Sequence, residues 1–109
     1  MQTAYIRFLN LIESLDEFNE LTPIQHFIIK KIAVMWGRKE KVTVTKILNF
    51  KSLASPSTLY RELTQLKKMG YLKLKPNMID RRIKEVMPTP KLIKLQDKFE
   101  GAFSKAITL

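Results

Sequence analysis

Three hydroxyl residues in this chain are each followed directly by proline, in the pairs Thr22-Pro23, Ser55-Pro56 and Thr89-Pro90. A hydroxyl can accept a hydrogen bond from the first turn of a helix. Proline is tolerated at the first helical position because its missing N–H would have no partner there. Each pair is therefore predicted to begin a helix. Gly37 and Gly70 are predicted to end the first two of these helices, because glycine accepts the left-handed conformation beyond a helix end.

The remaining segments are assigned by their hydrophobic period. Helical spacing predicts a first helix over about Thr3–Phe18 and a short third helix over Val44–Asn49, capped by Thr43, after a charged loop at 38–41. Beyond Gly70 the period changes to alternation, which predicts strands at 71–75 and 83–87 joined by a loop over 76–82.

The expected fold class follows from this order of elements. Four helices, a hairpin and a last helix predict a mainly α protein with a small β-hairpin wing, a winged helix-turn-helix of five helices and two strands. A length of 109 residues suits a single domain over 1–109. Within it we expect N-terminal helices at 1–37, the helix-turn-helix and wing at 38–88, and a C-terminal helix at 89–109.

The positive charge is concentrated in the middle of the chain. The formal net charge is +10, yet residues 1–37 sum to −1 and residues 95–109 sum to zero. Residues 38–94 hold fifteen basic and four acidic side chains, an excess of +11. A basic block between near-neutral flanks indicates a polyanionic partner. The alternative interpretation is a charge run that only keeps the protein soluble.

The predicted fourth helix has two chemically different faces. Leu59, Leu63 and Leu66 recur at i, i+4 and i+7 and form an apolar stripe. The opposite face carries two hydroxyl residues and two cations with no acid among them: Ser57, Arg61, Thr64 and Lys68. Tyr60 and Gln65 lie on the flanks, Ser55 lies at the N-terminus, and Glu62, the only acid, is expected nearer the apolar stripe. This face suits phosphates and base edges in a major groove, although an ordinary amphipathic helix with a solvated face remains the alternative.

The hairpin loop carries the sequence Asp80-Arg81-Arg82, with Lys84 shortly after it. Arginine at a hairpin tip can enter a minor groove, and a neighbouring aspartate can hold the guanidinium extended. The alternative is a plain surface ion pair of little energetic value.

Taken together, these motifs resemble the winged-helix domain of MarR-type bacterial regulators over about 43–95. The resemblance rests on Ser55-Pro56-Ser57-Thr58-Leu59, Leu63, Leu66 and Gly70-Tyr71-Leu72, followed by Asp80 and Arg82 at the family's D-x-R positions. It implies a dimer with recognition helices in successive major grooves and the wing Arg82 in the minor groove. It also implies that Thr58 belongs to the DNA-binding helix.

The chain departs from this family in its C-terminal part. It is shorter, has one predicted C-terminal helix where the family often has two, and reads Met87-Pro88-Thr89-Pro90-Lys91 in place of the family's L-T-x-x-G. A small-molecule effector and the dimer geometry therefore stay open.

No pattern in the chain indicates catalysis. There are no cysteines, no Gly-rich phosphate loop and no metal-ligand cluster, and the single histidine, His26, falls on a predicted buried helix. We expect no enzyme activity, no cofactor and no metal. No apolar run reaches the length of a membrane span and no signal peptide is evident, so a cytoplasmic protein is expected, associated with the nucleoid if it is bacterial.

The leading hypothesis is sequence-specific binding of double-stranded DNA by a homodimeric transcription regulator. The dimer is expected to form through the wide apolar stripe of the first helix and the heptad-like apolar residues of the last, which are Leu92, Leu95, Phe99, Ala102, Phe103 and Ala106. The two helices could instead pack only on one another within a monomer. Two other functions stay open: a protein-interaction module, and sequence-independent nucleic-acid binding in replication or chromatin.

Overall fold

The computed structural model describes residues 2–108. The order of its elements is α1 (Ala4–Glu13), α2 (Asp16–Glu20), α3 (Pro23–Gly37), α4 (Val44–Leu48), α5 (Pro56–Lys68), β1 (Leu72–Pro76), β2 (Lys84–Pro88) and α6 (Pro90–Ile107). The expected fold class, a mainly α winged helix with one hairpin, is confirmed. Residues 1 and 109, the outer bounds of the expected domain, lie outside the described residues.

The three predicted hydroxyl caps are present. The side-chain oxygens of Thr22, Ser55 and Thr89 each accept a hydrogen bond from the backbone N–H three residues later. Thr22 also forms a capping box, because the Gln25 side chain accepts from the Thr22 backbone N–H at 2.9 Å. Local sequence therefore suffices to place the beginnings of α3, α5 and α6.

The first predicted helix is divided, so the described residues hold six helices in place of the expected five. The division falls at Ser14 and Leu15, where the Ser14 hydroxyl donates to the Leu11 carbonyl at 2.6 Å. The Asn19 side-chain amide then donates to the carbonyls of Glu13 and Leu15. Such side-chain bonds give the backbone an alternative to the helical ladder, which is why the helix stops there.

The hairpin is antiparallel, with Leu72 opposite Pro88 and Leu74 opposite Val86. A third short segment, Val42 and Thr43 just before α4, joins its edge. The Val86 N–H donates to the Val42 carbonyl at 2.8 Å, and Thr43 forms an isolated bridge with Glu85. This pairing fixes the wing against the start of α4.

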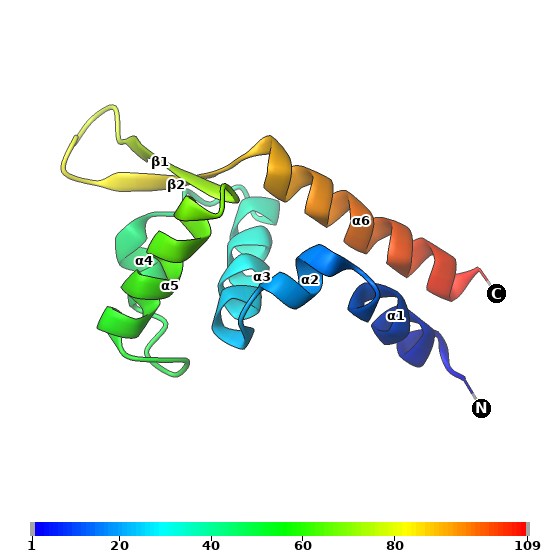
Figure 1. Ribbon diagram of the computed structural model, residues 1–109. Coiled ribbons are helices and arrows are strands. Elements are labelled where there is room, and N and C mark those ends of the chain that lie inside the picture. Colours follow the sequence, from blue (N-terminus) through cyan, green and yellow to red (C-terminus); the bar gives the residue numbers. More distant parts are fainter. Residues whose placement is uncertain (1, 109) are drawn as a thin grey trace.

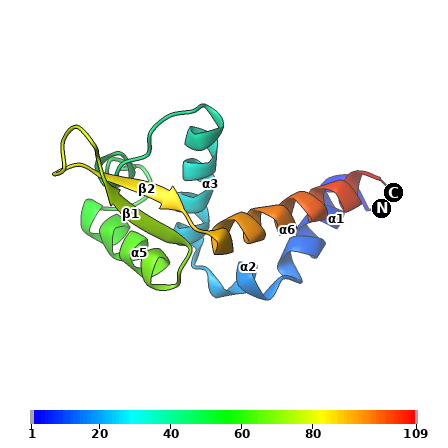
Figure 2. The same ribbon diagram turned by 90° about the horizontal axis from the view of Figure 1, so that it is seen from above.

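The core lies where α3, α5, β1 and α6 meet. Ile28, Ile32, Leu59, Leu66 and Leu92 are fully buried in one continuous cluster. Beyond this core the molecule is elongated, with extents of 52 × 26 × 23 Å. Figures 1 and 2 show α1 and the C-terminal half of α6 side by side at one end, and the hairpin loop at the other.

None of the helices within residues 2–108 is both long enough and apolar enough to span a bilayer.

Candidate nucleic-acid interface

Helix α5 presents its polar face to solvent. Leu59, Leu63 and Leu66 are buried, as their spacing predicts. On the opposite face Ser57, Arg61 and Lys68 are exposed, and Gln65 on the flank is exposed as well. Amphipathic spacing on a helix of this length thus decides which side chains a ligand can reach.

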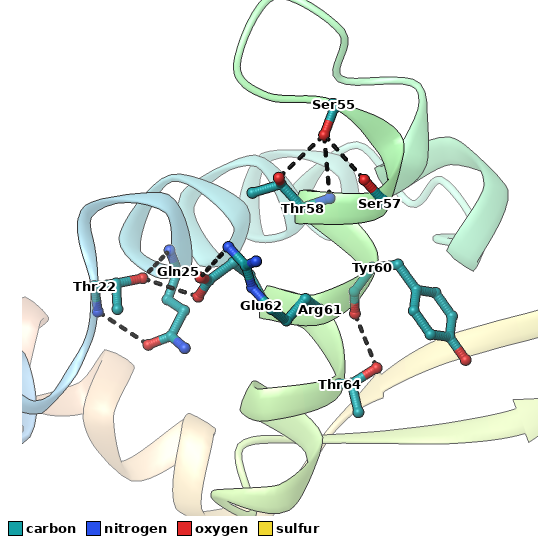
Figure 3. Close-up of polar contacts among 9 residues, drawn as sticks. All are labelled: Thr22, Gln25, Ser55, Ser57, Thr58, Tyr60, Arg61, Glu62 and Thr64. Atoms are coloured by element: carbon teal, nitrogen blue, oxygen red, sulfur yellow. Dashed lines mark hydrogen bonds and ion pairs between the residues drawn. The ribbon is translucent and has the colours of Figure 1, made fainter.

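Three hydroxyls cluster at the N-terminus of α5 (Figure 3). The Ser55 hydroxyl accepts from the Thr58 N–H at 3.3 Å, donates to the Thr58 hydroxyl at 3.0 Å, and lies 3.2 Å from the Ser57 hydroxyl. The helix N-terminus carries partial positive charge, and hydroxyls beside it can turn toward an acceptor. This end of α5 therefore suits a phosphate group.

Arg61 forms a long ion pair with its neighbour on α5, Glu62. Its guanidinium lies 3.8 Å from a Glu62 carboxylate oxygen, and the other carboxylate oxygen accepts from the Thr22 hydroxyl at 3.1 Å. Glu62 is largely buried, in agreement with its expected place near the apolar stripe, and it ties α5 to the start of α3 (Figure 3). Because Arg61 is exposed, its ion pair is weak, and a phosphate or a guanine edge can replace it.

Thr64 is less available than the face count predicts. It is half-buried, and its hydroxyl donates to the Tyr60 carbonyl at 2.8 Å, so its proton is already committed. Tyr60 is 58% exposed and lies on the side of α5 that faces the hairpin, away from Arg61 (Figure 3). The ring is therefore the more accessible group of the two for a thymine methyl or a base face.

Lys67 is a further candidate that the sequence analysis did not include. With Tyr60, Thr64, Val44 and Leu74 it lines a small pocket of about 90 Å³ between α5, α4 and β1. The signal was present in the sequence, because Tyr60, Thr64 and Lys67 are spaced i, i+4 and i+7 on one side of the helix.

The wing carries a two-point ion pair. The Arg82 Nε donates to the Asp80 Oδ1 at 3.1 Å and a terminal nitrogen donates to Oδ2 at 3.0 Å, while the Arg82 N–H also bonds Oδ1. The side-chain bonds, and to a lesser extent the backbone bond, hold the pKa of Asp80 below its usual value. The Asp80 carboxylate in turn raises the pKa of Arg82. Arg82 keeps 91% of its side chain exposed, so the pair orients the guanidinium without hiding it.

The other cations of the wing, Arg81 and Lys84, are exposed on the same hairpin. Figures 1 and 2 show the hairpin loop extending beyond α5, at the end of the molecule opposite α1. The structure thus provides two polar elements at one end, a helix face and a projecting loop, rather than a single concave pocket.

The contacts of His26 are with Phe18, within the packing of the helices. Its Nε2 lies 2.7 Å from the Phe18 carbonyl oxygen, and its ring packs against the Phe18 ring, tilted by 36° with 4.2 Å between centroids. Over residues 2–108 no group of three or more acidic, histidine or cysteine side chains lies close enough to hold a metal ion.

Comparison with known proteins identifies the fold. No family profile matches the chain, and no curated protein sequence matches it. Among solved structures, the chain is similar to a MarR-like transcriptional regulator from Thermotoga maritima, with a TM-score of 0.75 at 18% identity, covering 94% of this chain and 70% of that one.

Two further structures give the same result. Another transcriptional regulator from Thermotoga maritima has a TM-score of 0.71 at 19% identity, covering 95% of this chain and 67% of that one. The MepR protein of S. aureus, solved with ethidium bromide, has a TM-score of 0.69 at 19% identity over 94% and 68% of the two chains. The chain therefore has the winged-helix fold of MarR-type regulators.

Proposed function

We propose that this protein is a MarR-type transcription regulator that binds specific sites on double-stranded DNA as a homodimer. The observation that carries the proposal is the pairing of an acid-free exposed face on α5 with the oriented Arg82 on the wing, at one end of the molecule. Both lie in the segment 38–94 with its charge excess of +11. The structural likeness to transcriptional regulators supports the same function.

In this proposal α5 enters the major groove. The Ser55, Ser57 and Thr58 hydroxyls and the N-terminal backbone of α5 receive a phosphate, Arg61 exchanges Glu62 for a guanine edge, and Lys68 neutralises a phosphate farther along. Tyr60, Gln65 and Thr64 contact the flanks of the site, Thr64 through its methyl group. On the hairpin, Arg82, held by Asp80, enters the minor groove, while Arg81 and Lys84 contact the backbone on either side.

The far end of the molecule supports the proposed dimer. Helices α1 and α6 pack on one another, with the Phe8 and Phe103 rings edge to face at 6.4 Å, and the Arg7 guanidinium donates to the Ala106 carbonyl. Even so, Tyr5, Ile6, Phe103 and Ile107 remain exposed there. An open apolar groove of about 630 Å³ between α1, α3 and α6 adds to this surface. A second copy of the chain would bury these groups. Each chain contributes a single domain, so the dimer would present two α5 helices to the DNA. We expect this dimer in the cytoplasm.

Selection of bound duplexes from a random pool at near-physiological salt tests the function. A dimeric specific regulator enriches an inverted repeat with half-sites about one helical turn apart. Retention without an enriched sequence would instead show sequence-independent nucleic-acid binding. No retention would favour the protein-interaction module.

Point variants then test the residues. On the selected site, Arg61→Ala is expected to relax base preference, whereas Lys68→Ala weakens binding to all sequences and lowers the salt slope by about one charge. Lys105→Ala, an exposed cation on α6 at the far end, is the matched control and leaves both quantities unchanged. If Arg61→Ala leaves affinity and preference intact, the assigned face is wrong.

A further inference from the structure

The tip of the wing exposes two large apolar side chains. Met78 is 85% and Ile79 is 95% exposed, more than any other large hydrophobic residue in the described part of the chain. Most of the other exposed large hydrophobic residues lie on α1, α3 and α6, and Ile83, which is 41% exposed, lies on the same hairpin. An apolar pair at the apex of a projecting hairpin indicates contact with a partner that has an apolar surface.

The loop holds this pair outward by hydrogen bonds at its base. The Asn77 side-chain oxygen accepts from the N–H groups of Ile79 at 2.9 Å and Asp80 at 3.0 Å. The Asn77 N–H donates to the Ile83 carbonyl, and the Ile83 N–H donates to the Asp80 carbonyl. These bonds fix the backbone of the tip before it meets a partner, so little backbone entropy is lost on contact.

The charges around the tip select the kind of partner. Residues 75–84 hold four basic side chains and one acid, and that acid, Asp80, is already paired with Arg82. A partner that suits both the cations and the apolar pair has a dense negative backbone beside an apolar interior. The minor groove of duplex DNA meets this description, because phosphates line it and stacked bases lie beneath.

We propose that Met78 and Ile79 act as a wedge that enters between base pairs where the wing contacts the minor groove, unstacking one step and bending the duplex. The inference rests on the DNA-binding function proposed above. Pyrimidine–purine steps unstack most easily, so the wedge adds sequence preference at a position where no side chain reads a base edge. Arg82 enters the minor groove and positions the loop there, and the apolar pair deforms the DNA.

The test uses duplexes that carry the selected site, each with one 2-aminopurine at successive positions along the flank that the wing reaches. This base fluoresces when it is unstacked. The wild-type protein is expected to raise the fluorescence severalfold at one step in each half-site and to shorten the end-to-end distance measured by energy transfer. The double variant Met78→Ser with Ile79→Ser, which leaves Asp80 and Arg82 unchanged, is expected to abolish both signals.

Ile93→Ser removes an exposed isoleucine from α6 and is the matched control, with both signals retained. If the wild type binds the site while every 2-aminopurine stays quenched, or the double variant bends the DNA equally, the wedge is refuted and the DNA-binding function stands. If neither protein binds any duplex, both proposals fail. Binding of the wild type, but not the double variant, to vesicles of anionic lipid would then assign the tip to a membrane surface and overturn the wedge.

Discussion

Replacing Tyr71 by phenylalanine is expected to stabilise the protein. Tyr71 is completely buried, and within residues 2–108 its hydroxyl has no hydrogen-bond partner. A buried hydroxyl without a partner costs about 1–3 kcal/mol. Phenylalanine removes this group and keeps the ring, over which the Lys91 ammonium lies at 4.4 Å from the centroid. Only the dispersion contacts of one oxygen atom are lost, a few tenths of a kcal/mol.

The net expectation for Tyr71→Phe is a gain of about 1 kcal/mol in the free energy of unfolding, or roughly 5 °C in Tm. Urea unfolding followed by circular dichroism measures it, at one fixed protein concentration because a dimer's stability depends on concentration. Tyr60→Phe is the matched control. Because Tyr60 is exposed, this substitution should change the free energy of unfolding by no more than about 0.5 kcal/mol. A loss of 1 kcal/mol or more in Tyr71→Phe would refute the reasoning, because it would show that the hydroxyl is bonded.

The gain should also depend on pH. Burial raises the pKa of Tyr71 above its usual value of 10.0, and the charges of Glu20 and Glu17 add to the effect. Unfolded Tyr71 therefore loses its proton at lower pH than folded Tyr71 does. The contribution of the Tyr71 hydroxyl's raised pKa to the wild type's free energy of unfolding is therefore fully present below pH 10. It is lost as the pH rises through the folded pKa. The advantage of Tyr71→Phe should accordingly widen above pH 10, and an advantage that narrows there would contradict the burial argument.

Three further changes test other parts of the structure. Thr89→Val removes the cap of α6 and a hydroxyl bond of 2.6 Å to the Gly70 carbonyl, so unfolding should become easier by about 1–2 kcal/mol, whereas Thr89→Ser stays near the wild type. The pKa of the Asp80 carboxyl, measured by NMR, should lie below its usual value of 3.8, and Arg82→Gln should raise it back toward that value. A pKa of 3.8 in the wild type would show that the ion pair does not form in solution. Phe103→Glu should give a folded monomer by sedimentation, and an unchanged mass would show that the dimer forms elsewhere.

Much of the fold follows from interactions between residues three or four apart. The caps at Thr22, Ser55 and Thr89 bond groups three positions away, so a short stretch of sequence contains all the information needed to place them. The stripe of Leu59 and Leu63 likewise follows from helical geometry alone, which is why the exposed face of α5 was predictable. The change to alternation after Gly70 placed both strands to within one residue.

Interactions between distant segments were not predictable in this way. The bond between Val42 and Val86 crosses more than forty residues, so nothing near residue 42 indicates that it extends the hairpin. The hydrogen bond from Thr22 to Glu62, the partner of Arg61, depends on how α5 packs against α3. In the first helix, the competing bonds of Ser14 and Asn19 ended a pattern that periodicity alone continues to residue 18.

The sequence by itself determined the order of the elements, the polar face of α5 and the basic character of the wing, because each depends on local spacing or composition. Only the tertiary structure decided that α5 and the wing lie at one end while α1 and the C-terminal half of α6 lie at the other. It also decided that Ile79 stands in solvent at the hairpin tip, where alternation alone does not indicate exposure. The physical reason is that burial and direction come from packing among segments far apart in the chain, whereas caps and periods come from neighbours.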